Sequence, residues 1–477
     1  MRLDFALILS TLIAVSHVLG FISSLHAINK SRTPQGAMAW VLSLNIIPWL
    51  TLPFYWVFGR NRFHGYIEAL RQQQPEKAPP GQATELHRQL APFAAHLPPT
   101  IDTEFAVLEK LSRTPFTTGN HIELLIDGEN TFSAIFAAID SAKVYVLVQF
   151  FIIKHDQLGK KLRHHLIAKV KSGVPVCLLY DEIGSHALPF RYLSPLVKAG
   201  VSVSAFNSTR GPSNHFQLNF RNHRKIVVID GQVGFLGGLN VGDEYMGKGR
   251  LGHWRDTHLR LQGPVVQSLQ KVFSSDWYWA TRQLLKLNWD ACCAGKQTAM
   301  IYPSGPADEL ETCSMLFHQA IVASQHRLWI ASPYFVPSLP VMDMLQLAAL
   351  RGVDVRILLP SKPDHKLVYL SSFSFLEAAD LAGIKIYRYQ KGFLHQKVIL
   401  VDDDFTAIGT ANLDNRSLRL NFEVMAVTVD KAFAQSVANM LEQDFACSRQ
   451  TSYKDLSSRS CLFQWAVRAA RLFDPIL

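Results

Sequence analysis

The sequence predicts an α/β fold of two similar halves, preceded by two membrane-spanning helices. The motif H-x-K-x-x-x-x-D occurs twice in the 477 residues, and the second copy follows the first by 172 residues. Segments that flank the two copies correspond in order, and two long stretches near the N-terminus are almost free of charge. The two motifs supply His223, Lys225 and Asp230 in the first half, and His395, Lys397 and Asp402 in the second.

Strand-like segments recur in the same order around both motifs. Residues 144–151 match 328–335, residues 173–180 match 352–359, and residues 199–203 match 382–386. Each half therefore reads strand, helix, strand, helix, short strand and motif strand, and glycines before β-branched runs are typical of α/β units. We expect the halves to pack face to face, with the two histidines at their interface.

The residue types of the motif suit a phosphate group. His and Lys two places apart on a strand point to the same side, and the apolar runs 226–229 and 398–401 predict a buried strand. After each Asp, six residues intervene before a turn of small residues that ends in Asn240 or Asn412. Lys offers a charge, Asn an amide donor, and His a nucleophile or proton carrier. The alternative, a core histidine beside a lysine that reaches the surface, is disfavoured because the pattern recurs in both halves.

A further strand follows each motif and opens with a carboxylate, Asp256 in the first half and Glu423 in the second. A carboxylate against a catalytic imidazole orients the ring and stabilises its charged form. We expect Asp256 to pair with His223 and Glu423 with His395. The alternative is an ordinary surface acid at a strand end.

The N-terminal 59 residues predict two transmembrane helices, at about 5–27 and 37–58. The first stretch would span roughly 34 Å as a helix, which is enough for a bilayer. Pro48 and Pro53 are expected to kink the second. A cleaved signal peptide is the alternative, but the first stretch lacks a small-x-small cleavage site and a second apolar stretch follows at once.

The basic residues around these stretches place the large domain on the cytoplasmic side by the positive-inside rule. The loop between the stretches carries Lys30 and Arg32, whereas the other side carries Arg2, Arg60, Arg62 and Arg71. The net charge of +10 suits anionic lipid or nucleic acid, and the anchor favours lipid.

The rest of the chain divides at composition changes. Residues 60–118 form a linker, Pro-rich at 72–82, and a helical lead-in; residues 119–295 and 296–477 form the two halves. The second half ends in an amphipathic tail with Trp465, Arg468 and Arg471, which either lies on the membrane or packs on the domain. The six cysteines show no metal-ligand or disulfide spacing, and we expect neither metal nor cofactor.

These motifs resemble the phospholipase D superfamily, and the wider sequence resembles the bacterial cardiolipin synthases that carry two such motifs. The similarity rests on the two motif segments, on residues 237–245, 254–258 and 409–417, on the N-terminal helix pair, and on the last four residues. It covers nearly the whole chain. Asp230 and Asp402 belong to the superfamily signature by this resemblance, and we expect them to brace the site from the far end of the strand.

The resemblance implies a reversible phosphatidyl transfer at a bacterial inner membrane. Two phosphatidylglycerols would give cardiolipin and glycerol through a phosphohistidine, and the resemblance favours His223 as the nucleophile. A membrane-bound phospholipase D that releases phosphatidic acid would carry the same residues. A nuclease is disfavoured by the anchor, and an inactive scaffold by two intact motifs. The sequence leaves open the acceptance of phosphatidylethanolamine and the oligomeric state, a homo-oligomer included.

Overall fold

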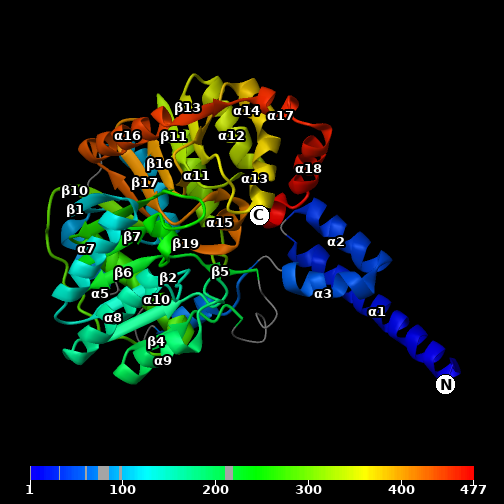
Figure 1. Cartoon of the computed structure of the whole chain (residues 1–477), viewed down its shortest axis with the longest axis horizontal. Helices are drawn as coiled ribbons and strands as arrows, with labels where there is room; N and C mark the ends of the chain where they lie inside the picture. Colours follow the sequence, from blue (N-terminus) through cyan, green and yellow to red (C-terminus); the bar gives the residue numbers. More distant parts are fainter. Residues whose placement is uncertain (1, 32, 60–61, 74–84, 96–98, 210–218) are drawn as a thin grey trace.

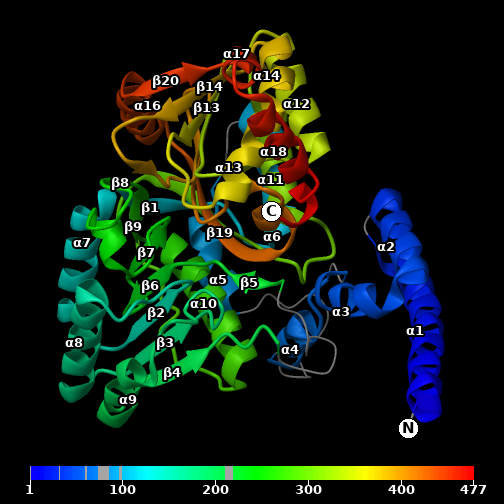
Figure 2. The same ribbon diagram turned by 45° about the vertical axis from the view of Figure 1, so that its right-hand side comes forward.

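The computed structural model describes residues 2–31, 33–59, 62–73, 85–95, 99–209 and 219–477 (Figure 1). Its body is one long twisted sheet with helices on both faces, and a group of three N-terminal helices stands beside it (Figures 1 and 2).

Alternating strands and helices build the first half, as predicted. Its elements are β1 (Thr117–Ile126), α7 (Asp127–Ser141), β2 (Val146–Phe150), α8 (Gln157–Lys171), β3 (Val176–Tyr180), α9 (Phe190–Ala199), β4 (Ser202–Ala205), β5 (Arg221–Asn222), β6 (Ile226–Ile229), β7 (Val233–Gly237), β8 (Trp254–Arg255), β9 (Thr257–Gln262) and α10 (Val265–Thr281). Because successive strand residues face opposite ways, Val146 and Val148 pack with α7 and α8, whereas Leu147 packs with α10.

The second half repeats this plan. Its elements are β10 (Gln297–Ser304), α11 (Thr312–Ala323), β11 (Arg327–Ala331), β12 (Phe335–Val336), α12 (Leu339–Leu350), β13 (Asp354–Pro360), α13 (Lys366–Ser372), α14 (Leu376–Ala382), β14 (Lys385–Tyr389), β15 (Phe393–Leu394), β16 (Val398–Val401), β17 (Phe405–Gly409), β18 (Leu413–Asp414), α15 (Asn415–Arg419), β19 (Asn421–Val429), α16 (Lys431–Ala446), β20 (Ser448–Thr451), α17 (Tyr453–Ser457) and α18 (Cys461–Arg471).

Strand order confirms the duplication. From the middle outward, β1-β9-β7-β6-β2-β3-β4 in the first half corresponds to β10-β19-β17-β16-β11-β13-β14 in the second, and β1 pairs antiparallel with β10. The two sheets are therefore continuous through their edges. Strands β2, β3 and β4 are parallel to one another, as are β11, β13 and β14, because crossover helices connect them; β20 then adds antiparallel to β14 at the edge of the second half.

The predicted match between residues 144–151 and residues 328–335 is displaced by two residues. Val146 pairs with Ile229, and Leu328 pairs with Val401, which is 172 residues beyond Ile229. Val146 therefore corresponds to Leu328, whereas the sequence comparison matched Val144 to it. A shift of two keeps every side chain on its face, so the hydrophobic pattern did not reveal the error.

The N-terminal anchor differs from the prediction in its second stretch. The helix α1 (Arg2–Lys30) is continuous, but α2 (Pro34–Ile46) and α3 (Pro48–Phe58) are separate helices. Pro48 lacks an N–H and disfavours a helical residue before it, and Ile47 has φ −135° and ψ 60°. Within the described residues, only α1 is both long and apolar enough to cross a bilayer unaided.

The lead-in joins the anchor to both halves. The helix α4 (Tyr66–Gln73) packs against α10, and α5 (Glu85–Leu90) follows. The helix α6 (Pro99–Ser112) packs on the second half, where Phe105 stacks on Phe405 at 4.2 Å between ring centroids. Most of the predicted Pro-rich linker, from residue 74 onward, lies outside the described residues.

Candidate active site

Short strands from each half cross to the other half and carry the two motifs together. β5, just before His223, pairs with β19 of the second half, and β15, just before His395, pairs with β8 of the first. The backbone N–H of His223 donates to the Phe422 carbonyl at 2.9 Å, and that of His395 to the Arg255 carbonyl at 2.8 Å. Each histidine is therefore placed beside the carboxylate of the opposite half. β5 and β19 meet between the two halves in Figure 1.

The histidine–carboxylate pairs are crossed, which corrects the predicted pairing. His223 Nδ1 lies 2.9 Å from Glu423 Oε2, and His395 Nδ1 lies 2.7 Å from Asp256 Oδ2. The sequence argument paired each histidine with the carboxylate of its own half, because that one is nearer along the chain. The crossed strand pairing decides otherwise. Each Nδ1 is occupied, so the Nε2 of each ring remains the atom for chemistry.

Both lysines are buried beside the histidines. Lys225 Nζ donates to the carbonyl of His223 at 2.6 Å, and Lys397 Nζ donates to that of His395. Burial lowers the pKa of Lys225 well below its usual value, and lowers the pKa of Lys397 to about 8, although nearby carboxylates oppose the shift. Two buried cations with depressed pKa values are suited to an anionic ligand, whose charge would restore their protonated forms.

The two histidines belong to one electrostatic unit. Burial lowers the pKa of His223 to about 4 while Glu423 opposes the shift, and Lys397 of the other half contributes to the lowering. Burial also lowers the pKa of His395 well below 6.5, and Lys397, Lys225 and His223 act in the same direction. Charges from both halves therefore act on each ring, and both act to keep the imidazoles neutral near pH 7.

The two carboxylates have different surroundings. Glu423 accepts hydrogen bonds from the hydroxyls of Thr410 at 2.6 Å and Ser417 at 2.8 Å, and from the amide of Asn421 at 3.2 Å. Burial works to raise its pKa, but His223, Lys225 and the Thr410 hydroxyl lower it overall. Asp256 accepts the N–H of Thr257 at 2.8 Å, and burial raises its pKa to about 6.

The two asparagines are close to the motifs but are engaged within the protein. Asn240 Nδ2 donates to the Tyr245 hydroxyl at 2.8 Å, and its Oδ1 accepts the N–H of Ile152. Asn412 Nδ2 lies 3.4 Å from Asp414 Oδ2, and its own Oδ1 is buried without a partner. Each amide nitrogen carries two hydrogens and uses one of them in these contacts, so its second N–H can donate to a phosphate.

Asp230 and Asp402 lie at the opposite ends of the motif strands from the histidines. Asp230 accepts the backbone N–H groups of residues 143–145, and Asp402 those of residues 325–327, all within 2.9 Å. Each sits at positive φ, 55° and 47°, at the turn after the strand. They hold the loops that lead into β2 and β11, which matches the bracing position expected for them.

Several aromatic and ionic neighbours were missed by the sequence argument. Trp254, Tyr245 and Phe393 surround the His395 ring at 5.3–6.0 Å, and Phe151 lies 4.9 Å from His223. Aligning the two halves on their carboxylates could have pointed to Trp254. It stands two places before Asp256, as Asn421 stands two places before Glu423.

A buried ion pair supports the first motif from behind. Arg224 bonds Asp276 at 2.7 Å and donates its Nε to the Glu423 carbonyl at 3.0 Å. Tyr66, from α4 next to the anchor, donates to the same Asp276 at 2.6 Å. The network spans three distant segments, so no sequence spacing announces it.

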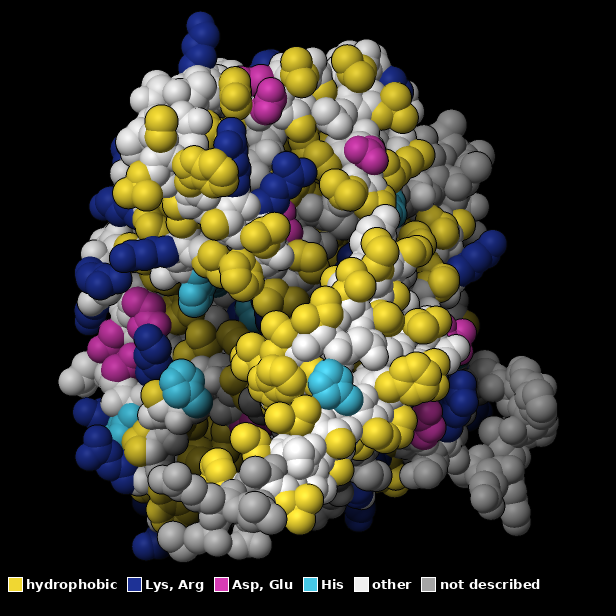
Figure 3. Space-filling model, turned by 90° about the vertical axis from the view of Figure 1, so that its right-hand side faces the viewer, with side chains coloured by type: hydrophobic (Ala, Val, Ile, Leu, Met, Phe, Trp, Pro, Cys, Tyr) yellow, Lys and Arg dark blue, Asp and Glu magenta, His cyan; other side chains and the backbone are white. Residues whose placement is uncertain are grey.

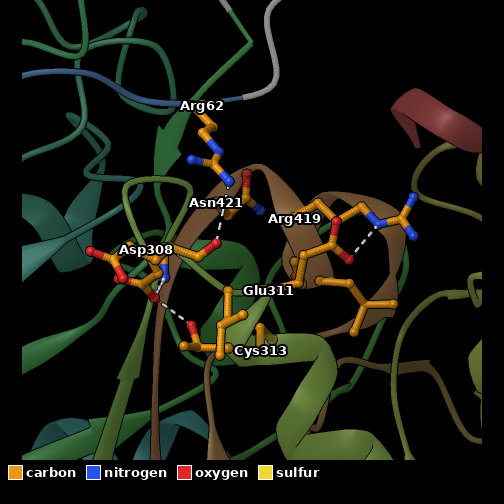
Figure 4. Close-up of a pocket in the computed structure, with 12 residues that line it drawn as sticks. Arg62, Asp308, Glu311, Cys313, Arg419 and Asn421 are labelled. Carbon is orange, nitrogen blue, oxygen red and sulfur yellow. Dashed lines mark hydrogen bonds and ion pairs between the residues drawn. The ribbon is translucent and has the colours of Figure 1, made fainter. Parts of the chain in front are cut away.

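A cavity of about 240 Å³ is lined by two of the residues that donate to Glu423 (Figure 4). Ser417 and Asn421 are in its wall, and Arg62, from the segment after α3, donates toward the Glu309 carbonyl there. The motif histidines and lysines do not line this cavity. Among the described residues, no group of three or more His, Cys, Asp or Glu side chains is arranged to hold a metal ion.

Comparison with known proteins agrees with this geometry. The family model described as cardiolipin synthase, phospholipase D-like domain, matches residues 135–277 and 317–445, and a phospholipase D–nuclease N-terminal model matches residues 12–60. Cardiolipin synthase A of Pseudomonas putida (strain GB-1) is 50% identical over 477 residues, which cover 98% of each chain. Cardiolipin synthase A of Pseudomonas aeruginosa (strain LESB58) is 49% identical, covering 98% of this chain and 96% of that one.

A solved structure shares the fold. The crystal structure of phosphatidylserine synthase from Haemophilus influenzae superposes with a TM-score of 0.60 at 16% identity, covering 79% of this chain and 100% of that one. The family match extends over both motifs and over the crossed histidine–carboxylate pairs. The chain therefore belongs to the cardiolipin synthase family of phospholipase D-like proteins.

Proposed function

We propose that the protein is a cardiolipin synthase that transfers a phosphatidyl group between two phosphatidylglycerols and releases glycerol. The observation that carries this proposal is the crossed pairing His223–Glu423 and His395–Asp256, which joins both motifs in one buried, cationic site. The cardiolipin synthase relatives, similar along nearly the whole chain, support a lipid acceptor.

In the first step, we propose that neutral His223 attacks the phosphorus of one phosphatidylglycerol through Nε2. A phosphorus–nitrogen bond forms, the bond to the glycerol oxygen breaks, and His395 gives its proton to that oxygen. The anionic phosphodiester favours the protonated form of His395, which burial and the neighbouring lysines disfavour. Lys225 and Lys397, with Asn240 and Asn412, stabilise the charge on the phosphoryl oxygens.

In the second step, the terminal hydroxyl of another phosphatidylglycerol attacks the phosphorus. His395 takes the hydroxyl proton, the phosphorus–nitrogen bond breaks, and cardiolipin leaves. Each step is the other with a different alcohol, so the transfer is reversible. Glu423 and Asp256 orient the rings and offset their positive charge.

The decisive experiment supplies purified protein in detergent with phosphatidylglycerol alone. Cardiolipin and glycerol should appear in equal amounts. If phosphatidic acid is the main product, water and not a lipid hydroxyl resolves the intermediate, and the phospholipase D alternative replaces this proposal. Adding phosphatidylethanolamine then tests whether a second headgroup is accepted.

We further propose a multi-pass protein of the bacterial inner membrane with a cytoplasmic catalytic body. The helix α1 would span the bilayer, and α2 with α3 would return as a broken second span, with the basic residues Arg62 and Arg71 on the cytoplasmic side. In intact cells, with exposed native cysteines replaced, an impermeant thiol reagent should label a cysteine at Thr33 and spare one at Glu68. The opposite pattern places the body outside.

A further inference from the structure

The C-terminal helix α18 has two apolar stripes. Phe463, Val467 and Ala470 face inward; Val467 and Ala470 are buried, and Phe463 packs edge-on against Phe373, at 5.4 Å. A second stripe, formed by residues 462, 465, 469 and 472, falls within roughly 80° of the helix circumference on the other side, at about 100° per residue. A helix that only packs on the body needs one stripe.

The outer stripe is bare. Leu462 is 81% exposed, Trp465 65% and Leu472 80%. Tryptophan is concentrated at membrane–water interfaces, where its ring is apolar and its N–H reaches polar groups. Large apolar side chains grouped on one helix face mark an interaction surface.

The charge around this stripe is all of one sign. Arg468 lies beside it, with its guanidinium 5.3 Å from the centre of the Trp465 ring, and Arg471 is exposed further round the helix; no acidic residue occurs between Asp455 and Asp474. Apolar side chains beside arginines form the pattern of a helix that lies in the surface of an anionic bilayer.

The position of α18 in the fold also favours contact with a bilayer, because the helix lies on the side of the anchor and near the site. The helix lies on the side of the body that carries α1 to α3, and apolar side chains are abundant on this face (Figures 1 and 3). It packs on α13, which starts directly after Asp364 and His365. Burial lowers the pKa of His395, and Asp364 opposes that shift, so the start of α13 adjoins the catalytic centre.

We propose that the outer face of α18, with Leu462, Trp465 and Leu472 as its apolar contacts and Arg468 and Arg471 as its anionic-lipid contacts, docks on the bilayer and presents the site to lipid. This contact fixes the orientation in which a lipid headgroup reaches His223 and His395 without leaving the membrane. The choice of an anionic lipid as partner rests on the proposed function.

A local probe tests the contact in the full chain. With Cys292, Cys293 and Cys461 replaced by serine, an environment-sensitive fluorophore is attached at Trp465→Cys or, as a control, at Phe190→Cys on α9. Phe190 is 80% exposed, and α9 lies away from the anchor (Figure 2). In phosphatidylethanolamine–phosphatidylglycerol vesicles that contain a lipid-bound quencher, the probe at 465 should be quenched and the probe at 190 should not. Equal quenching at both positions overturns the proposal.

The turnover of variants on vesicles and in micelles provides a second test. The triple variant Leu462→Ser, Trp465→Ser and Leu472→Ser, and separately Arg468→Gln with Arg471→Gln, should lose about fivefold or more of their turnover on vesicles. Both should keep wild-type turnover in mixed detergent micelles, as should Phe190→Ser in either system. Loss in micelles as well as on vesicles, or no loss on vesicles, overturns the proposal. If the wild type makes phosphatidic acid, the proposed function fails, while the ratio of the two turnovers still tests α18.

Discussion

The two histidine–carboxylate pairs have the same geometry but opposite surroundings. The His223–Glu423 pair is held by hydroxyl and amide donors, from Thr410, Ser417 and Asn421. The His395–Asp256 pair lies among aromatic rings, with Trp254 at 5.3 Å from His395. The difference follows from substitutions at equivalent positions of the repeat.

Thr410, which donates to Glu423, corresponds to Gly238, where an added Cβ would lie 2.1 Å from Asp256 Oδ1. Asn421, which also donates to Glu423, stands where the first half has Trp254. Against its burial, His223, Lys225 and the Thr410 hydroxyl lower the pKa of Glu423, whereas burial raises that of Asp256 to about 6. The two carboxylates thus differ in the groups that surround them. The assignment of His223 as nucleophile and His395 as proton carrier stays a proposal that the trapping experiment below tests.

The largest expected effect comes from removing either histidine. His223→Ala and His395→Ala should each lower activity by about 10⁴-fold or more, and the double variant should be little worse, because residues that act as one unit are not additive. His164→Ala, at an exposed position of α8, is the control. Two separate sites would instead leave each single variant with roughly half of the activity.

Acid-quenched trapping separates the two roles. With phosphate-labelled phosphatidylglycerol, acid-labile label should attach to His223, whereas headgroup-labelled lipid should leave no label because glycerol departs. Label that survives in His223→Ala and vanishes in His395→Ala would exchange the roles of the two halves.

The pH dependence of kcat/KM should be bell-shaped, with limbs near pH 6 and pH 8. Burial raises the pKa of Asp256 to about 6, so its carboxylate, required beside His395, is lost as the pH falls through that value. Burial lowers the pKa of Lys397 to about 8, so its charge is lost as the pH rises through that value. Asp256→Asn should lower the maximum about 100-fold or more and abolish the acid limb. Glu423→Gln should also lower the maximum of kcat/KM but keep the limb near pH 6. If that limb disappears in Glu423→Gln, it belongs to the His223–Glu423 pair.

Substitutions at Gly238 and Thr410 test directly whether the surroundings of Asp256 and Glu423 differ. Gly238→Ala should displace Asp256 and lower kcat by about tenfold or more, since a small misplacement of a catalytic partner is costly. Thr410→Ala removes one of the three hydroxyl and amide donors that accompany His223 at Glu423 and should lower kcat by only about two- to fivefold, and Thr410→Ser should restore it. Equal losses of kcat in Gly238→Ala and Thr410→Ala would show that the surroundings of the two carboxylates do not differ.

The smallest effect on kcat is expected at Asp230 and Asp402, which make the same backbone contacts in the two halves. Asp230→Asn and Asp402→Asn each weaken three backbone hydrogen bonds and should lower the free energy of unfolding by about 1–3 kcal/mol. Well below the unfolding temperature, kcat should stay within about threefold of wild type. Asp403→Asn, which alters an exposed ion pair with Arg327, should leave the melting temperature nearly unchanged. A loss of kcat comparable to that of the histidine variants would give these residues a direct part in catalysis.

Much of the molecule could be predicted from its sequence. The exact spacing of the motifs, the apolar runs 226–229 and 398–401, and the matched order of segments indicated two α/β halves with one shared site. Local rules are sufficient there, because a buried strand and a side chain two places along it are set by neighbours in the chain. The apolar length of α1 was predictable for the same reason. The proline break at Ile47 was underestimated as a kink, because the two prolines were judged within one continuous apolar stretch.

Only the tertiary structure decided which groups meet in the site. The pairing of β5 with β19 and of β15 with β8 carries each histidine across to the carboxylate of the opposite half, and no local pattern distinguishes this from pairing within a half. The aromatic surroundings of His395, the donors around Glu423 and the network of Arg224, Asp276 and Tyr66 likewise join segments distant in the chain. By itself, the sequence determined the reacting groups and the repeat that presents them. The contacts that set the pKa of each carboxylate, and so distinguish the two histidines, arise from burial and from partners that only the folded chain brings together.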